Sequence, residues 1–139
     1  MAPPTVTAEV VLGDGHASGR QHRTSLRLSW YVADPLAVHV LLTAQPDHPA
    51  LPRGQWTMLR DFLRYGLSHP TGDGDVRVRP GPGGVTVVVD LTRDGRCTTV
   101  RIAASMVRDF LDATEDIVPA GEEQSAAALD ELIERLTRA

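Results

Sequence analysis

The stretch GLSHPTGDGDVRVRP, residues 66–80, decides the fold because it joins a helical pattern to an alternating one. Gly66 follows a helical stripe and stands where a left-handed residue commonly ends a helix. Pro70 and the glycines after it predict a turn. In Asp75–Pro80 the valines alternate with Arg77 and Arg79, which predicts a strand with the valines inward. A helix that passes through one tight turn into a strand indicates helices combined with antiparallel sheets.

The acidic turn Asp73-Gly74-Asp75 also suggests a calcium or phosphate loop. A calcium loop needs further oxygen ligands at regular positions and a distal glutamate, whereas the next five residues are Val, Arg, Val, Arg and Pro. A phosphate cradle leads into a helix N-terminus, but this loop leads into a strand. We therefore interpret the turn as a connection, and we expect neither a metal nor a cofactor.

The residues just before this turn show helical spacing. The residues further upstream alternate with the two-residue period of strands. Gln45–Gly54 contains three prolines in ten residues and predicts a loop or an edge extension. Arg60, Asp61 and Arg64 are expected to face solvent, opposite an apolar helical stripe of Trp56, Leu59, Phe62, Leu63 and Leu67. Three alternating segments upstream predict an antiparallel meander: Thr5–Leu12, His22–Val32 and Leu36–Thr43.

Strands and helices also follow the turn. Val85–Thr92 and Cys97–Ala103 predict a hairpin closed by an Asp-Gly pair. Ser105 is expected to cap a second helix, with an apolar stripe of Met106, Val107, Phe110, Leu111 and Thr114 and a solvated face of Asp109, Asp112, Glu115 and Asp116. The sequence thus predicts one α+β domain over residues 1–139, in the order βββ-α-βββ-α-α, with residues 121–139 as a C-terminal amphipathic helix.

Composition limits the classes of function. The chain has 139 residues, of which 42% are hydrophobic and 23% charged, as in soluble globular proteins. The net charge is −4 and all 14 basic residues are arginine, which argues against a protein that binds nucleic acid by general phosphate neutralisation. Cys97 is the single cysteine and is interpreted as a small apolar side chain in a strand. Neither a signal peptide nor a membrane-length apolar run is recognisable, so a cytoplasmic location is expected.

No arrangement of catalytic residues emerges from the sequence. The five histidines are scattered singly, without metal-ligand spacing on one element, and His39 is interpreted as a surface residue of a strand. The serines lack the context of a nucleophile elbow. We therefore predict a protein without enzymatic activity.

Two surfaces are candidates for binding a partner. Arg77 and Arg79, with Arg101 on another strand, are able to line one sheet face and contact an acidic partner or single-stranded nucleic acid. These strands lack the aromatic residues on which bases stack, so a solvated face is favoured. The last helix carries an apolar stripe of Leu129, Leu132, Ile133 and Leu136, which either packs on its own sheet or docks another chain.

Three blocks and the closing helix resemble one known family. The blocks are YVADPLAV (Tyr31–Val38), RDFLRYGLSHPTGDGDVRVRP (Arg60–Pro80) and FLDATEDIVPAGEE (Phe110–Glu123), and the helix contains LDELIERL. Their order and spacing are similar to those of the SsgA-like sporulation and cell division proteins of actinobacteria. The segment between the first two blocks is longer and more proline-rich than the family pattern, and it retains only Trp56 at a matching place.

This resemblance implies a fold, an assembly and a role. The fold would be a small bell-shaped one with antiparallel sheets and packed helices, forming a homotrimer and similar to trimeric single-strand nucleic-acid-binding proteins. The family is associated with placement of the sporulation septum and acts through protein contacts. Its best-understood branch recruits the tubulin-like division protein FtsZ with help from a paralogue. None of its members is known as an enzyme.

Overall fold

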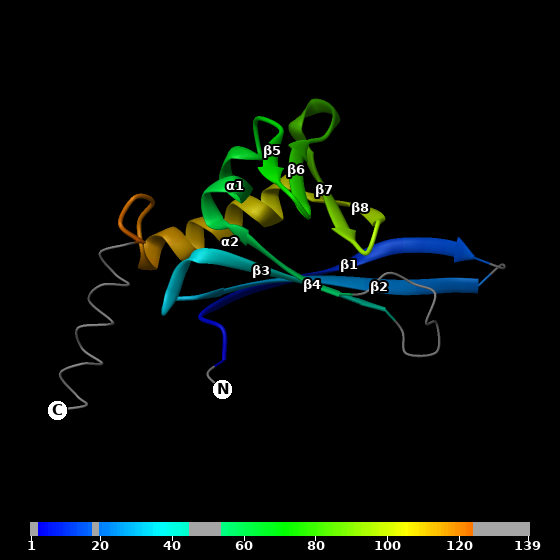
Figure 1. Cartoon of the computed structure of the whole chain (residues 1–139), viewed down its shortest axis with the longest axis horizontal. Coiled ribbons are helices and arrows are strands. Elements are labelled where there is room, and N and C mark those ends of the chain that lie inside the picture. Colours follow the sequence, from blue (N-terminus) through cyan, green and yellow to red (C-terminus); the bar gives the residue numbers. More distant parts are fainter. Residues whose placement is uncertain (1–2, 18–19, 45–53, 124–139) are drawn as a thin grey trace.

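The chain repeats one unit twice: four antiparallel strands followed by a helix (Figure 1). The computed structural model describes residues 3–17, 20–44 and 54–123. The first unit comprises β1 (Val6–Ala17), β2 (Arg20–Tyr31), β3 (Asp34–Ala44), β4 (Gly54–Leu59) and α1 (Arg60–Tyr65). The second comprises β5 (Thr71–Asp73), β6 (Val76–Pro80), β7 (Thr86–Arg93), β8 (Arg96–Ala103) and α2 (Ala104–Ile117), with a short 3₁₀ turn at Pro82–Gly84.

The α+β class predicted from the sequence is confirmed, and each half has one strand more than expected. In the first sheet the strands follow chain order, so the predicted meander is confirmed and β4 extends it. Leu28, Val40 and Trp56 lie opposite one another on its inner face. All three are buried, because alternate residues of a strand point to the same side.

The prediction of a helix from Trp56 onward is wrong for its first turn, because Trp56–Leu59 belong to strand β4. Burial alternates along β4, with Trp56 and Met58 inward and Thr57 and Leu59 exposed. The apolar residues of this segment fit both the helical period and the two-residue period of a strand. Hydrogen-bonded pairing with the edge of β3 stabilises the strand instead of the helix. Helix α1 therefore begins only at Arg60.

Gly66 is required by close packing, not by a left-handed helix end as we expected. Its backbone is right-handed helical, at φ −63° and ψ −15°. A Cβ atom at this position would lie 2.3 Å from Cγ1 of Val78. The absence of a side chain therefore lets the residue that ends α1 lie directly against Val78 of β6.

The second sheet has the order β5-β6-β7-β8. Its first strand was missed, and the stretch around Asp73–Asp75 is the hairpin between β5 and β6, with Gly74 at φ +70°. The turn interpretation of this stretch is thus confirmed. Asp94 and Gly95, at φ +53° and +76°, form the tight turn of the β7–β8 hairpin that the Asp-Gly pair predicted.

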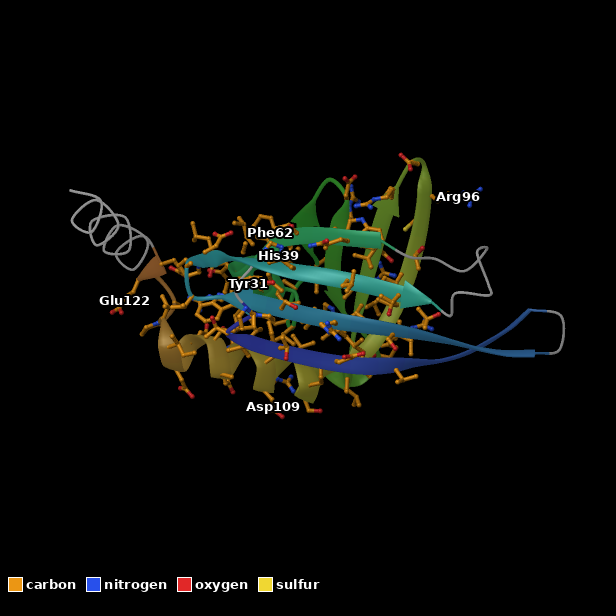
Figure 2. The ribbon with its side chains drawn as sticks, turned by 90° about the horizontal axis from the view of Figure 1, so that it is seen from below. Tyr31, His39, Phe62, Arg96, Asp109 and Glu122 are labelled. Atoms are coloured by element: carbon orange, nitrogen blue, oxygen red, sulfur yellow. The ribbon has the colours of Figure 1, made fainter. Side chains whose placement is uncertain are left out.

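The core fills the space between the two sheets and α2. On the second sheet, Val78, Val89 and Val100 form an inner row across three strands. The apolar stripe predicted on α2 is confirmed, but Ala103 and not Ser105 stands at the N-cap. Both helices lie on the side of the first sheet that faces the second, so no described helix covers its opposite face (Figures 1 and 2).

Candidate interaction surfaces

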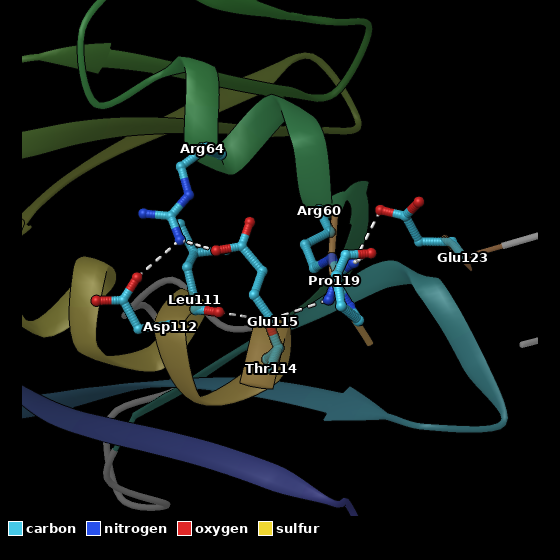
Figure 3. A network of polar contacts seen from close by, with 8 residues as sticks. All are labelled: Arg60, Arg64, Leu111, Asp112, Thr114, Glu115, Pro119 and Glu123. Carbon is cyan, nitrogen blue, oxygen red and sulfur yellow. Dashed lines mark hydrogen bonds and ion pairs between the residues drawn. The ribbon is translucent and has the colours of Figure 1, made fainter. Parts of the chain in front are cut away.

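The segment after α2 is tied to the body of the protein by a buried arginine. Arg60 is 2% exposed, which corrects the expectation that it faces solvent. Its Nη2 donates to Oε1 of Glu123 at 2.8 Å and Nη1 donates to Oγ1 of Thr114 at 3.3 Å (Figure 3). The guanidinium also lies 5.6 Å from the ring centroid of Trp30. Because α1 begins at Arg60, this side chain enters the space between β2, α2 and the turn after α2.

This ion pair is almost fully withdrawn from solvent, with side chains 2% and 6% exposed. Burial raises the pKa of Glu123, but the hydrogen bond from Arg60, backbone N–H groups and the charge of Arg60 together lower that pKa below its usual 4.5. Glu123 is therefore ionised at neutral pH. Nε of Arg60 is buried and has no hydrogen-bond partner among the described residues. Glu123 is the carboxylate that compensates the charge of this buried guanidinium.

A second arginine of α1 holds the same two helices together. Arg64 donates to Asp112 at 2.9 Å and also contacts Glu115, both on α2 (Figure 3). Burial lowers the pKa of Arg64, but these two carboxylates raise it more. Asp112 and Glu115 therefore link α1 to α2. Asp112 is exposed, as the interpretation of a solvated acidic face expected, whereas Glu115 is partly buried and that interpretation is wrong for it.

The three arginines proposed as a binding surface do share one face of the second sheet. We define the arginine face as the side of this sheet opposite the core, with Arg77 and Arg79 on β6 and Arg101 on β8. Arg79 and Arg101 flank Val88 in one row across the strands. Arg77 lies in the next row, beside Asp90. The alternation of valine and arginine in the sequence was the signal for this arrangement.

Asp90 compensates part of the positive charge on this face. Arg79 donates to its carboxylate, and Oγ1 of Thr99 donates to Oδ1 at 2.7 Å. The bond from Thr99 lowers the pKa of Asp90, burial opposes this, and Arg79 and Arg77 lower that pKa further, so the net shift is downward. Ion pairs of Arg77 or Arg101 are absent within the described part of the chain.

A contact between the two sheets was not foreseen from the sequence. The guanidinium of Arg93 lies 4.7 Å from the ring centroid of Trp56, and Nε1 of Trp56 donates to the carbonyl oxygen of Thr92 at 3.0 Å. With Gln55 and Asp75, these side chains line a cavity of about 330 Å³. Trp56 and Arg93 are 37 positions apart, and neither carries a local signal for the contact.

The remaining predicted residues divide into two groups. Leu129, Leu132, Ile133 and Leu136 lie outside the described residues. His39 and Cys97 are described: the rings of His39 and Tyr31 make a T-shaped contact on the face of the first sheet that no described helix covers, and Cys97 is exposed on β8. Residues 3–17, 20–44 and 54–123 contain no cluster of three or more His, Cys, Asp or Glu able to hold a metal ion. No helix of these residues is long and apolar enough to span a membrane.

The buried ion pair joins the beginning of one family-like block to the end of another. Arg60 is the first residue of RDFLRYGLSHPTGDGDVRVRP, and Glu123 is the last residue of FLDATEDIVPAGEE. Residues 24–123 match the family described as "Streptomyces sporulation and cell division protein, SsgA". The chain belongs to the SsgA family. The match begins in β2 and ends at Glu123, so it includes the cluster around Arg60 and the arginine face.

The similarity of the chain to individual SsgA-family proteins supports this assignment. The chain is 31% identical over 114 residues to the sporulation-specific cell division protein SsgB of Thermobifida fusca, covering 80% of each chain. A crystal structure of an SsgA-like sporulation-specific cell division protein from Thermobifida fusca superposes with a TM-score of 0.75 at 25% identity, over 97% of this chain and 98% of that one.

A second solved structure is that of SsgB from Streptomyces coelicolor, a protein whose mutations correlate to longitudinal cell division during sporulation. It superposes with a TM-score of 0.64 at 32% identity, over 87% of this chain and 94% of that one. These similarities support a role for the family member described here in cell division during sporulation.

Proposed function

We propose that this chain is a non-enzymatic interaction protein of sporulation-specific cell division, which helps to place or recruit the septation machinery. The observation that carries the proposal is the match of residues 24–123 to the SsgA family, whose members with similar sequences are named sporulation-specific cell division proteins. It acts in the cytoplasm at the division septum, and its target is FtsZ, contacted directly or through an SsgA-family paralogue.

The structure supports an interaction role through its surfaces. The arginine face, and the face of the first sheet that no described helix covers, both carry exposed side chains on paired strands, a geometry suited to protein contact. The ion pairs of Arg60 and Arg64 link α1 to α2 and to the segment that follows α2. We further propose that the chain assembles as a homotrimer, which would present three copies of each face to the partner.

The test is a pull-down of purified FtsZ, and separately of each SsgA-family paralogue, by the full-length chain. Retention of FtsZ directly, or only when a paralogue is present, is the expected result and separates the two routes. The Leu132→Asp variant tests the apolar stripe of the C-terminal segment by placing a charge in it. The Glu131→Gln variant, which changes a polar residue of the same segment, is its matched control. Failure to retain FtsZ and every paralogue would refute the proposal.

A further inference from the structure

The arginine face is a local positive surface on a negatively charged protein. The whole chain carries a net charge of −4, yet this face has three arginines and one compensating carboxylate, Asp90. Arg79 is paired with Asp90, whereas Arg77 lies beside Asp90 without an ion pair and Arg101 has no ion pair with any described residue. Such a surface attracts an acidic partner selectively, because the rest of the protein repels one.

The floor between the arginines is apolar and protected. Val88 points to the arginine face but is only 4% exposed. We attribute this burial to the aliphatic stems of Arg79 and Arg101, which flank Val88 in the register, since arginine side chains cover apolar surface while their guanidinium groups stay in water. This row therefore places a positive charge on each side of a buried valine.

A hollow lies beside Arg77 at the edge of the sheet. It has a volume of about 350 Å³, and Thr71, Gly72, Arg77, Arg79 and Asp90 contribute to its wall. Gly72 lies opposite Arg77 in the register and has no side chain to fill the space. A Cβ atom there would lie 2.3 Å from the carbonyl oxygen of Val76, so the backbone geometry itself requires glycine. Gly72 is thus part of the backbone geometry of the β5–β6 hairpin, which borders the hollow.

We propose that the arginine face binds an extended acidic segment of a partner protein, with carboxylates on alternate residues of that segment. Arg77 and Arg101 lie two strands apart and in neighbouring rows, about 12 Å, which is close to the span of four residues in an extended peptide. Two carboxylates of the segment reach Arg77 and Arg101, the two arginines without a partner. The inference rests on the proposed function as an interaction protein and names the chemistry of one partner contact.

Single-stranded nucleic acid fits this face less well. Its described outward residues on β6, β7 and β8 are aliphatic, hydroxyl-bearing, charged or cysteine, and none is aromatic, so they provide no stacking platform for bases. Affinity for a polyanion grows with the number of phosphates neutralised. Two unpaired arginines on an acidic protein supply few such contacts.

The test is fluorescence anisotropy with the full-length chain at low salt. The probes are a labelled peptide of four Glu-Thr repeats and a labelled 16-nucleotide oligo-dT. The Arg77→Gln/Arg101→Gln variant removes two charges from the face while leaving the Arg79–Asp90 pair intact. The matched control, Arg96→Gln/Arg108→Gln, removes two charges from exposed arginines elsewhere. All four side chains are exposed, so thermal unfolding of both variants should stay within about 2 °C of the parent chain.

We expect saturable peptide binding that weakens about tenfold in the first variant and less than twofold in the control, with weaker binding of oligo-dT. Equal weakening in both variants, or no peptide binding by the parent chain, would overturn the inference. Tighter binding of oligo-dT, lost in the first variant, would replace it with a nucleic-acid site. If the peptide binds while FtsZ and the paralogues do not, only the proposed identity of the partner is wrong. If FtsZ or a paralogue binds while the peptide does not, the assignment of the arginine face as the binding site is wrong.

Discussion

The buried pair Arg60–Glu123 gives the sharpest prediction about how the family-like blocks stabilise the fold. Changing Glu123→Gln keeps the size of the side chain and removes its charge. Arg60 would then remain 2% exposed and charged, with neutral hydrogen-bond partners only. Breaking one side of a buried ion pair costs about 3–5 kcal/mol. Because glutamine still accepts a hydrogen bond and Trp30 still contacts the guanidinium, we expect the lower end, about 3 kcal/mol.

The assay is urea and thermal unfolding followed by circular dichroism. For a chain of this size, a loss of about 3 kcal/mol lowers the midpoint temperature by about 10 °C. Glu122→Gln is the control, since Glu122 is exposed beside Glu123, and it should change the free energy of unfolding by less than about 0.5 kcal/mol. Equal stability of the two variants would refute the assignment of Glu123 as the counter-ion of Arg60.

The pH dependence of the same variant follows from the lowered pKa of Glu123. In the unfolded chain Glu123 binds a proton near pH 4.5, whereas in the folded chain it does so only at lower pH. Its stabilising contribution is therefore present above pH 4.5 and is lost as pH falls through the folded pKa. The stability difference between the parent chain and Glu123→Gln should stay constant near neutral pH and shrink in acid. A difference that grows on acidification would contradict this sign.

Three further experiments test other parts of the structure and its assembly. Gly66→Ala places a methyl group against Val78 and should destabilise by about 1–3 kcal/mol, whereas adding Val78→Ala to it should cost less than the sum of the two single changes, as measured by urea unfolding. Arg93→Gln removes the cation–π contact with Trp56 and should cost about 1 kcal/mol and change tryptophan fluorescence; an unchanged spectrum would contradict the contact. Light scattering at micromolar concentration should report a mass three times that of the 139-residue chain, and a monomer would remove the proposed trimer.

Local periodicity was sufficient for most of the fold. The valines of β6 and the stripe of α2 repeat with the period of the element that they form, so their burial follows from the sequence. The outward position of the arginines on β6 follows from the same alternation. These patterns carry information because each strand or helix must bury one face against the same core.

The missed features depend on partners that are distant in the sequence. β5 is only three residues long and exists through pairing with β6, and β4 exists through pairing with β3. Arg60 looked exposed because its counter-ion, Glu123, follows 63 residues later. The one available signal was that these two residues stand at the outer ends of two family-like blocks. The requirement for Gly66 depends on Val78, which belongs to a different element.

The central claim, that this SsgA-family chain acts in sporulation-specific division, is tested most directly in the organism that encodes it. Its coding sequence would be deleted and then restored at another site, and septa would be counted during vegetative growth and during sporulation. We predict normal vegetative growth with sporulation septa that are missing or misplaced, and recovery on restoration. Normal number and spacing of sporulation septa in the deletion strain would contradict the account.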